Sequence, residues 1–147
     1  MPTVETTPLR IELRRTIAAP PERVFAAWTT EALLRAFICP GRPGGARVTI
    51  DARLGGRFHI DMLGEEEGQV WPHDGEYLEF DPPRRLRFTW VSLACPAEVG
   101  SQVSIDFSAK GGGTEIVLVH ERLATAKDVD GHTKGWTAIF DQLAAVV

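Results

Sequence analysis

The feature that most constrains the fold is the pattern of the last twenty residues, 128–147. Apolar residues and one histidine recur there at three- and four-residue steps, which places them along one side of an α-helix. The residues on this stripe are Val129, His132, Trp136, Ile139, Phe140, Leu143 and Val147. Asp128 and Asp130 supply capping groups and negative charge at the helix start, where the helix dipole is positive. We therefore predict one long amphipathic C-terminal helix.

Two glycines, Gly131 and Gly135, lie inside this predicted helix. Each costs about 1 kcal/mol of helix stability relative to alanine. Their presence suggests that another part of the protein packs close to the helix backbone. For Gly131, a ragged helix start is the alternative.

Before Val119 the chain consists mostly of short segments in which apolar and polar residues alternate, as in half-buried strands. A first strand at residues 9–17 precedes a short helix at 22–28 and a second with Leu33, Leu34 and Phe37 as its apolar stripe. About six more strands follow, including an alternating segment at residues 48–54 and a segment at 70–80 in which proline and glycine imply a bulge or an edge.

Short turns between these strands make consecutive neighbours antiparallel. A long amphipathic helix that follows many strands needs a sheet on which to pack. We predict an α+β helix-grip fold, in which a curved antiparallel sheet of about six to seven strands wraps around the long C-terminal helix, with two short helices after the first strand.

Length and composition narrow the class of protein. The 147 residues are typical of one domain, which we place at residues 9–147 after a disordered tail at 1–8. The net charge of −4 argues against nucleic-acid and anionic-membrane partners. The start of the chain lacks the basic and apolar regions of a signal peptide, so we expect a cytoplasmic protein with two reduced cysteines, acting as a monomer or homodimer. We expect no metal, because the cysteines are far apart and form no zinc motif. We also expect no cofactor.

Several segments together resemble a known family. They are residues 24–29 (Val-Phe-Ala-Ala-Trp-Thr), residues 54–58 (Leu-Gly-Gly-Arg-Phe), residues 75–89 from Gly-Glu-Tyr to Arg-Phe-Thr, residues 113–120 (Gly-Thr-Glu-Ile-Val-Leu-Val-His), and Gly135-Trp136 with Leu143. In this order they are similar to the bacterial homologues of the activator of the heat-shock protein 90 ATPase, in the START-like (SRPBCC) superfamily. The resemblance covers the chain from about Leu9 to its end. Where the family commonly carries one or two tryptophans after the second short helix, this chain has Ala36-Phe37.

The resemblance implies a helix-grip fold with a cavity, and it does not imply one activity. Members of the family include hydrophobic-ligand binders and proteins described as chaperone activators, and the superfamily also contains cyclases and hydrolases. The candidate ligand-binding residues are those of the inward strand parity and the helix stripe: Trp28, Phe37, Phe58, Met62, Tyr77, Phe88, Trp90, Leu118, His120, Trp136 and Phe140. Either these residues line an apolar pocket, or they form a filled core.

Some polar residues have two open interpretations. His120 shares its parity with Leu118 and should point inward, as a core histidine with a hydrogen-bond partner or as a group that orients a ligand. Glu79 shares its parity with Tyr77 and is either a paired inward carboxylate or a surface residue. His59 and His73 are expected to face solvent. The arginines Arg57, Arg85 and Arg87 form a solvated sheet face, or one of them binds a carboxylate.

Three functions remain open. The first is binding of a small apolar or amphipathic ligand between sheet and helix, which requires an enclosed cavity of roughly 300 Å³ or more. The second is modulation of a chaperone through an exposed apolar patch. The third is an enzyme that uses converging titratable groups in a cleft. No nucleophile elbow, P-loop or dinucleotide motif is present, and we assign no catalytic residue.

Overall fold

The computed structural model describes residues 3–7 and 9–147. The described residues form an eight-stranded antiparallel sheet in the order β1-β2-β8-β7-β6-β5-β4-β3. The strands are β1 (Thr3–Thr7), β2 (Arg10–Ile17), β3 (Ala46–Ile50), β4 (Arg57–Leu63), β5 (Val70–Asp81), β6 (Arg85–Thr89), β7 (Gln102–Lys110) and β8 (Gly113–Glu121), and the helices are α1 (Pro21–Thr29), α2 (Glu31–Arg35) and α3 (Ala126–Val146).

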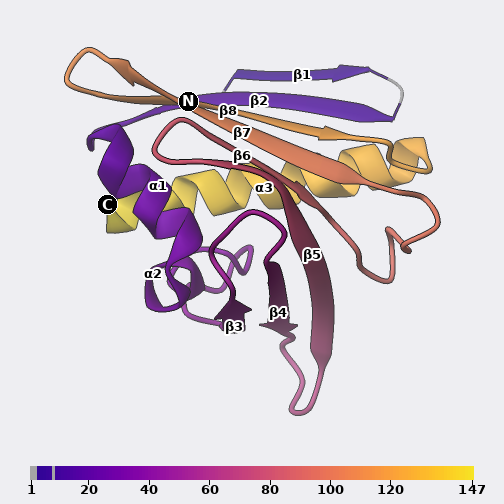
Figure 1. Ribbon diagram of the computed structural model, residues 1–147. Coiled ribbons are helices and arrows are strands. Elements are labelled where there is room, and N and C mark those ends of the chain that lie inside the picture. Colours follow the sequence, from indigo (N-terminus) through magenta and orange to yellow (C-terminus); the bar gives the residue numbers. More distant parts are fainter. Residues whose placement is uncertain (1–2, 8) are drawn as a thin grey trace.

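The predicted helix-grip fold is confirmed. In Figure 1, α3 runs along one side of the sheet, and α1 and α2 lie beside its C-terminal half. The seven strands β2–β8 match the predicted count, and β1 adds an eighth. Trp28 of α1 packs against Trp136 and Phe140 of α3, with ring centroids 6.4 and 6.2 Å apart. The core therefore lies between the sheet and the helices.

The tail expected at residues 1–8 contains a strand, which corrects that expectation for Thr3–Thr7. This segment pairs with β2 in the register Thr3↔Arg14 to Thr7↔Arg10. Four of its five residues are threonine or valine, whose branched side chains favour the extended backbone. Residues 1, 2 and 8 lie outside the described part of the chain.

The long helix begins earlier than predicted. Its N-cap is Thr125, whose hydroxyl accepts a hydrogen bond from the backbone N–H of Asp128 at 3.1 Å. Asp128 is therefore in the first turn and contributes charge there without being the cap. The stripe residues Val129, Trp136, Ile139, Phe140 and Leu143 are buried, whereas His132 is half-buried.

Three further details of the strands and short helices differ from the sequence expectation. The strand expected at residues 48–54 ends at Ile50, and Leu54 lies in the following turn with 64% of its surface exposed. Leu33 is 47% exposed, because only Leu34 of α2 faces the core. The irregularity in β5 falls between Tyr77 and Glu79. Pro72 needs no bulge, since it sits in regular register opposite Asp61 of β4.

Candidate functional site

The centre of the space between the sheet and α3 is filled by side chains. The enclosed cavity that remains there measures about 20 Å³, close to the size of one water molecule. Aromatic rings account for most of its wall, since six of the ten lining residues carry a phenyl, phenol or indole ring from the sheet, α1 or α3. Its lining residues are Trp28, Leu34, Ile38, Phe58, Ile60, Tyr77, Leu86, Phe88, Trp90 and Trp136.

A larger groove opens beside this filled centre, at the N-terminal half of α3. Its volume is about 350 Å³. The buried side chains of Met62, Trp90, Trp136 and Ile139 are among its lining residues. The remaining residues that line it are Pro40, His73, Ala94, Lys127, Asp128, Gly131, His132 and Gly135.

Two loops hold the sides of this groove in place. The side-chain amide of Gln142 in α3 donates to the carbonyls of Phe37 and Cys39 at 2.9 and 2.8 Å and accepts from the N–H of Gly41, which fixes the loop that carries Pro40. The loop that carries Ala94 is closed by the backbone hydrogen bond from Ser92 to the carbonyl of Cys95 at 3.0 Å. The groove is thus built by ordered contacts on both sides.

The groove continues into a wider, open cleft of about 940 Å³. The two spaces share Pro40, Met62, His73 and Ala94 as lining residues. At the rim of the wider cleft, Trp71 and Leu93 are 46% and 77% exposed. Charged residues of both signs, Arg42, Glu65 and Glu66, also line the cleft. A molecule in the groove therefore has an open path to solvent.

The candidate residues named from the sequence divide between these environments. Trp90 and Trp136 line both the enclosed cavity and the groove, and Met62 lines the groove and the cleft. Trp28, Phe58, Tyr77 and Phe88 line only the 20 Å³ cavity. Phe37, Leu118, His120 and Phe140 are fully buried and line none of these spaces.

His120 points inward and belongs to a buried hydrogen-bond network. The indole N–H of Trp136 donates to Nδ1 of His120 at 3.0 Å, and Nε2 of His120 contacts the hydroxyl of Ser101. Because Nδ1 accepts, a neutral His120 carries its proton on Nε2 and donates it to Ser101. Burial, followed by the nearby His132, lowers the pKa of His120 to about 3. The imidazole is therefore neutral near pH 7, and it fixes the orientation of Trp136.

His132 links this network to the groove. Its ring lies 4.9 Å from that of His120 in an edge-to-face arrangement. Its Nδ1 donates to the carbonyl of Asp128 one turn earlier, at 2.8 Å, and its Nε2 lies 3.7 Å from the thiol of Cys95. Cys95 is fully buried, and burial raises the pKa of its thiol. This contact has the residue types of a nucleophilic pair, but the thiol lacks the depressed pKa and the access that such chemistry needs.

The expectation that His73 faces solvent is wrong. Its ring lies 4.9 Å from that of Trp90, and it lines both the groove and the cleft. Burial is the main cause that lowers its pKa. The signal for this position was its parity, since His73, Gly75 and Tyr77 alternate on one face of β5. His59 lies on the outer face, where its two nitrogens contact Asp74 and Asp61 at 2.6 and 2.7 Å.

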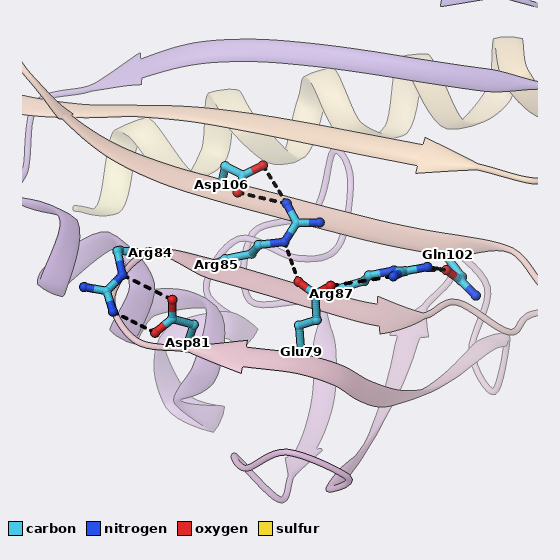
Figure 2. Close-up of polar contacts among 7 residues, drawn as sticks. All are labelled: Glu79, Asp81, Arg84, Arg85, Arg87, Gln102 and Asp106. Atoms are coloured by element: carbon cyan, nitrogen blue, oxygen red, sulfur yellow. Dashed lines mark hydrogen bonds and ion pairs between the residues drawn. The ribbon is translucent and has the colours of Figure 1, made fainter.

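The outer face of the sheet carries the charged residues (Figure 2). Glu79 lies there, because the bulge between Tyr77 and Glu79 reverses the parity after the buried Tyr77. Arg85 contacts Glu79 and donates to both oxygens of Asp106 at 2.9 and 2.8 Å, and Arg87 pairs with Gln102. Arg57 is paired with Glu76 at 3.4 Å. These groups are satisfied by one another on a surface remote from the groove.

Within residues 3–7 and 9–147, the structure contains no group of three histidine, cysteine, aspartate or glutamate side chains that could hold a metal ion. None of the helices in the same residues has the length and apolar character needed to cross a membrane.

Comparison with known proteins identifies the family to which this chain is similar. A family model described as "Activator of Hsp90 ATPase homolog 1-like protein" matches residues 18–147. The chain belongs to this family. Among curated proteins, activator of 90 kDa heat shock protein ATPase homolog 1 of Homo sapiens is 26% identical over 127 residues, which are 86% of this chain and 33% of the human protein. This member of the Hsp90 ATPase activator homologue family thus spans about a third of the length of the curated relatives that it matches.

Solved structures of bacterial proteins resemble this family member over nearly its whole length. Protein CV1439 from Chromobacterium violaceum superposes with a TM-score of 0.81 at 29% identity, covering 94% of this chain and 96% of its own. Protein NE0264 from Nitrosomonas europaea gives a TM-score of 0.79 at 25% identity, covering 94% and 93%. The family match and the similar structures indicate that this chain has a domain fold of the ligand-binding type.

Proposed function

We propose that this protein binds a small amphipathic molecule in the groove beside the N-terminal half of α3. The observation that carries the proposal is the groove itself: about 350 Å³, with a floor of buried apolar side chains and a mouth that opens into a wider cleft. Small-molecule sites in proteins commonly have volumes of roughly 300–1,000 Å³ and mostly apolar walls with a few polar groups.

The groove has both apolar walls and a few polar groups. Met62, Trp90 and Ile139 provide apolar and aromatic surface. His73 and His132 place imidazole groups at its sides. An amphipathic molecule would bury its apolar part against the floor and leave its polar part toward the cleft. The enclosed cavity of roughly 300 Å³ expected between sheet and helix is absent from the described residues, since the space there is about 20 Å³. The filled centre holds no ligand of this size, and the proposal therefore rests on the open groove.

Gly131 permits a direct test of this location. It lines the groove, and a Cβ added there would meet no atom within 4 Å. Gly131→Phe would place a ring in the groove, whereas Gly131→Ala leaves most of the space open. Both changes favour the helix relative to glycine, so neither is expected to unfold the protein. Loss of binding in the phenylalanine variant can then be assigned to the filled groove.

The experiment has two steps. Native mass spectrometry of the freshly purified protein would detect a retained ligand, and a thermal-shift screen of sterol-like compounds, aromatic polyketides and fatty acids would find others. A ligand at about 100 times its dissociation constant adds about 2.7 kcal/mol of stability, which raises the melting temperature by roughly 5–10 °C. We expect this rise for wild type and Gly131→Ala but not for Gly131→Phe. Equal shifts in all three proteins would refute the groove as the site.

The exposed rim favours a second candidate function, which is binding of a protein partner. Trp71 and Leu93 expose large apolar surfaces beside the cleft, and the human relative is named as an activator of a heat-shock ATPase. Adding this protein to a bacterial heat-shock protein 90 homologue would test the candidate. Saturable stimulation of the ATPase at micromolar concentration, lost in Trp71→Ala and Leu93→Ala but kept in Gly131→Phe, would favour this function over ligand binding. We expect no stimulation.

A further inference from the structure

We propose that the groove selects an uncharged ligand that carries a hydrogen-bond acceptor, such as a ketone or ester oxygen, and that this acceptor receives the indole N–H of Trp90. This inference rests on the proposed function, because it concerns the chemical class of the molecule in the same groove. It goes further by naming one donor and by excluding carboxylate ligands.

The first observation is an unsatisfied donor. The Nε1 atom of Trp90 is buried and has no protein hydrogen-bond partner among the described residues, and the same holds for Trp28. Trp136, in contrast, donates its N–H to His120. Buried polar groups are nearly always paired, so each exception requires an explanation. A ligand acceptor supplies one for Trp90.

The second observation is the position of Trp90. Its side chain is 3% exposed and lines both the groove and the enclosed cavity. The ring centroids of His73 and Trp136 lie 4.9 and 5.1 Å away. The indole is therefore held on two sides by other rings at the inner end of the groove. Trp28 lines only the enclosed cavity, so of these two unpaired indole donors only Trp90 belongs to a ring that also borders the groove.

The third observation is the absence of a buried cation to receive a carboxylate. Of the described residues that line the groove, Lys127 is the only lysine or arginine, and it is exposed and adjacent to Asp128. Arg42 lines the wider cleft, where it donates to the carbonyls of Leu63 and Gly64 and shares the wall with Glu65 and Glu66. A carboxylate moved to the inner end of the groove would be buried without a counter-charge, which is costly.

The buried titratable side chains near the groove and the cleft agree with this view. Burial lowers the pKa values of His73 and His120, so both imidazoles are neutral near pH 7. Burial also raises the pKa values of the Cys39 and Cys95 thiols, which keeps them protonated. These four side chains therefore bring no charge to the groove, and Asp128, which also lines it, is an acidic residue that disfavours a second carboxylate nearby.

Three naphthalene probes of similar size separate the possible ligand classes. The probe 2-acetylnaphthalene has a ketone acceptor and no charge, 2-ethylnaphthalene has no acceptor, and 2-naphthoate is an anion. Binding of each is measured by isothermal titration calorimetry at pH 7. A hydrogen bond to a buried donor corresponds to about a tenfold difference in dissociation constant. We expect the ketone to bind about ten times more tightly than the ethyl compound and the naphthoate.

The donor is identified by NMR on the wild-type protein labelled with nitrogen-15. The four tryptophans give four indole N–H signals, and the signal missing in Trp90→Phe assigns Trp90. We expect the ketone to move this signal downfield and the ethyl compound to move it much less. Trp71→Phe is the matched control, since it makes the same change at the exposed rim. It should leave the preference for the ketone intact, whereas Trp90→Phe should reduce that preference to about one.

The outcomes separate this inference from the proposed function. If no probe binds, or if Gly131→Phe binds all three as wild type does, the groove is not the site and both proposals fail. If the ethyl compound binds as tightly as the ketone, or the Trp90 signal stays in place, the groove binds ligands but Trp90 donates no hydrogen bond to them. The present inference then fails while the proposed function stands. Tightest binding of the naphthoate would overturn the selection of uncharged ligands. The wild-type measurements decide these cases even if Trp90→Phe folds poorly.

Discussion

Trp136 joins the core, the buried network and the groove, and substitutions there should separate these roles. Its side chain is 2% exposed and lies among Trp28, Trp90 and His120. Trp136→Ala removes this packing, which should cost about 3–5 kcal/mol of unfolding free energy. It also leaves Nδ1 of His120 without its donor. For a domain of ordinary stability, this is a large fraction of the total.

A more conservative change isolates the hydrogen bond. Trp136→Phe keeps an aromatic ring in the core but removes the N–H that reaches His120. Because His120 is fully buried, its unpaired nitrogen should cost about 1–3 kcal/mol, in addition to the smaller ring's loss of contacts. Thr137, the next residue, is half-buried and its hydroxyl bonds to the carbonyl of Thr133 within the helix. Thr137→Ala should therefore change stability by only a few tenths of a kcal/mol.

Urea denaturation followed by circular dichroism measures all three variants against wild type. The expected order of destabilisation is Trp136→Ala, then Trp136→Phe, then Thr137→Ala. Small and equal effects at Trp136 and Thr137 would refute the placement of the α3 face. A Trp136→Phe protein as stable as wild type would show that the bond to His120 is not required, and the account of the buried network would fail.

His120 should make the unfolding free energy depend on pH. Its pKa is lowered from 6.5 to about 3 on folding, so between these pH values the unfolded chain binds a proton that the folded protein does not. The contribution of His120 to stability is therefore complete above about pH 6.5 and falls as the pH drops toward 3. Denaturation at pH 7, 6 and 5 should show a smaller decline in His120→Gln, and equal declines would contradict the assignment. Gly131→Ala should raise the unfolding free energy by up to about 1 kcal/mol, and a decrease would show that the helix backbone is crowded there. Leu118→Trp should cost about 1–3 kcal/mol by overpacking, because Leu118 is fully buried and lies outside the 20 Å³ cavity; an unchanged midpoint would indicate hidden space. Cys39 and Cys95 should react with a disulfide reagent far more slowly in the native than in the unfolded protein, since both are buried with raised pKa values; similar rates would refute their burial.

The arrangement of strands and helices could be predicted from the sequence because each element carries its own period. Ile11, Leu13 and Ile17 alternate along β2 and are buried, as alternation predicts. The apolar stripe of α3 could also be predicted from the sequence, and its buried residues are those at three- and four-residue steps. The start of α3 was not, since Thr125 and Asp128 are both good capping residues and only the structure shows which hydroxyl meets the free N–H.

The inward face of β5 was harder to predict. Tyr77 and Glu79 are two residues apart, so simple alternation places both on the same face. The bulge between them breaks this rule, and Glu79 turns outward to the arginines in Figure 2. Before the bulge, the alternation holds and brings His73 inward beside Trp90. The alternation of inward and outward residues along a strand is clear in a sequence. The position of a β-bulge, which shifts that alternation by one residue, is not.

The location of the groove follows from side-chain size, which a list of apolar candidates does not capture. The aromatic residues expected to line a pocket fill the centre themselves, because large rings from the sheet, α1 and α3 meet there. Space remains where the facing residues are small. Gly131 and Gly135 of α3 and Ala94 of the adjacent loop line the groove. A Cβ at Gly131 would meet nothing within 4 Å, and one at Gly135 would only reach Pro40 at 3.7 Å. The two glycines were interpreted from the sequence as a sign of close packing against the helix backbone, with a ragged helix start as the alternative for Gly131. In the structure they have the opposite effect, because the missing side chains leave room along α3 for a molecule that is not part of the chain.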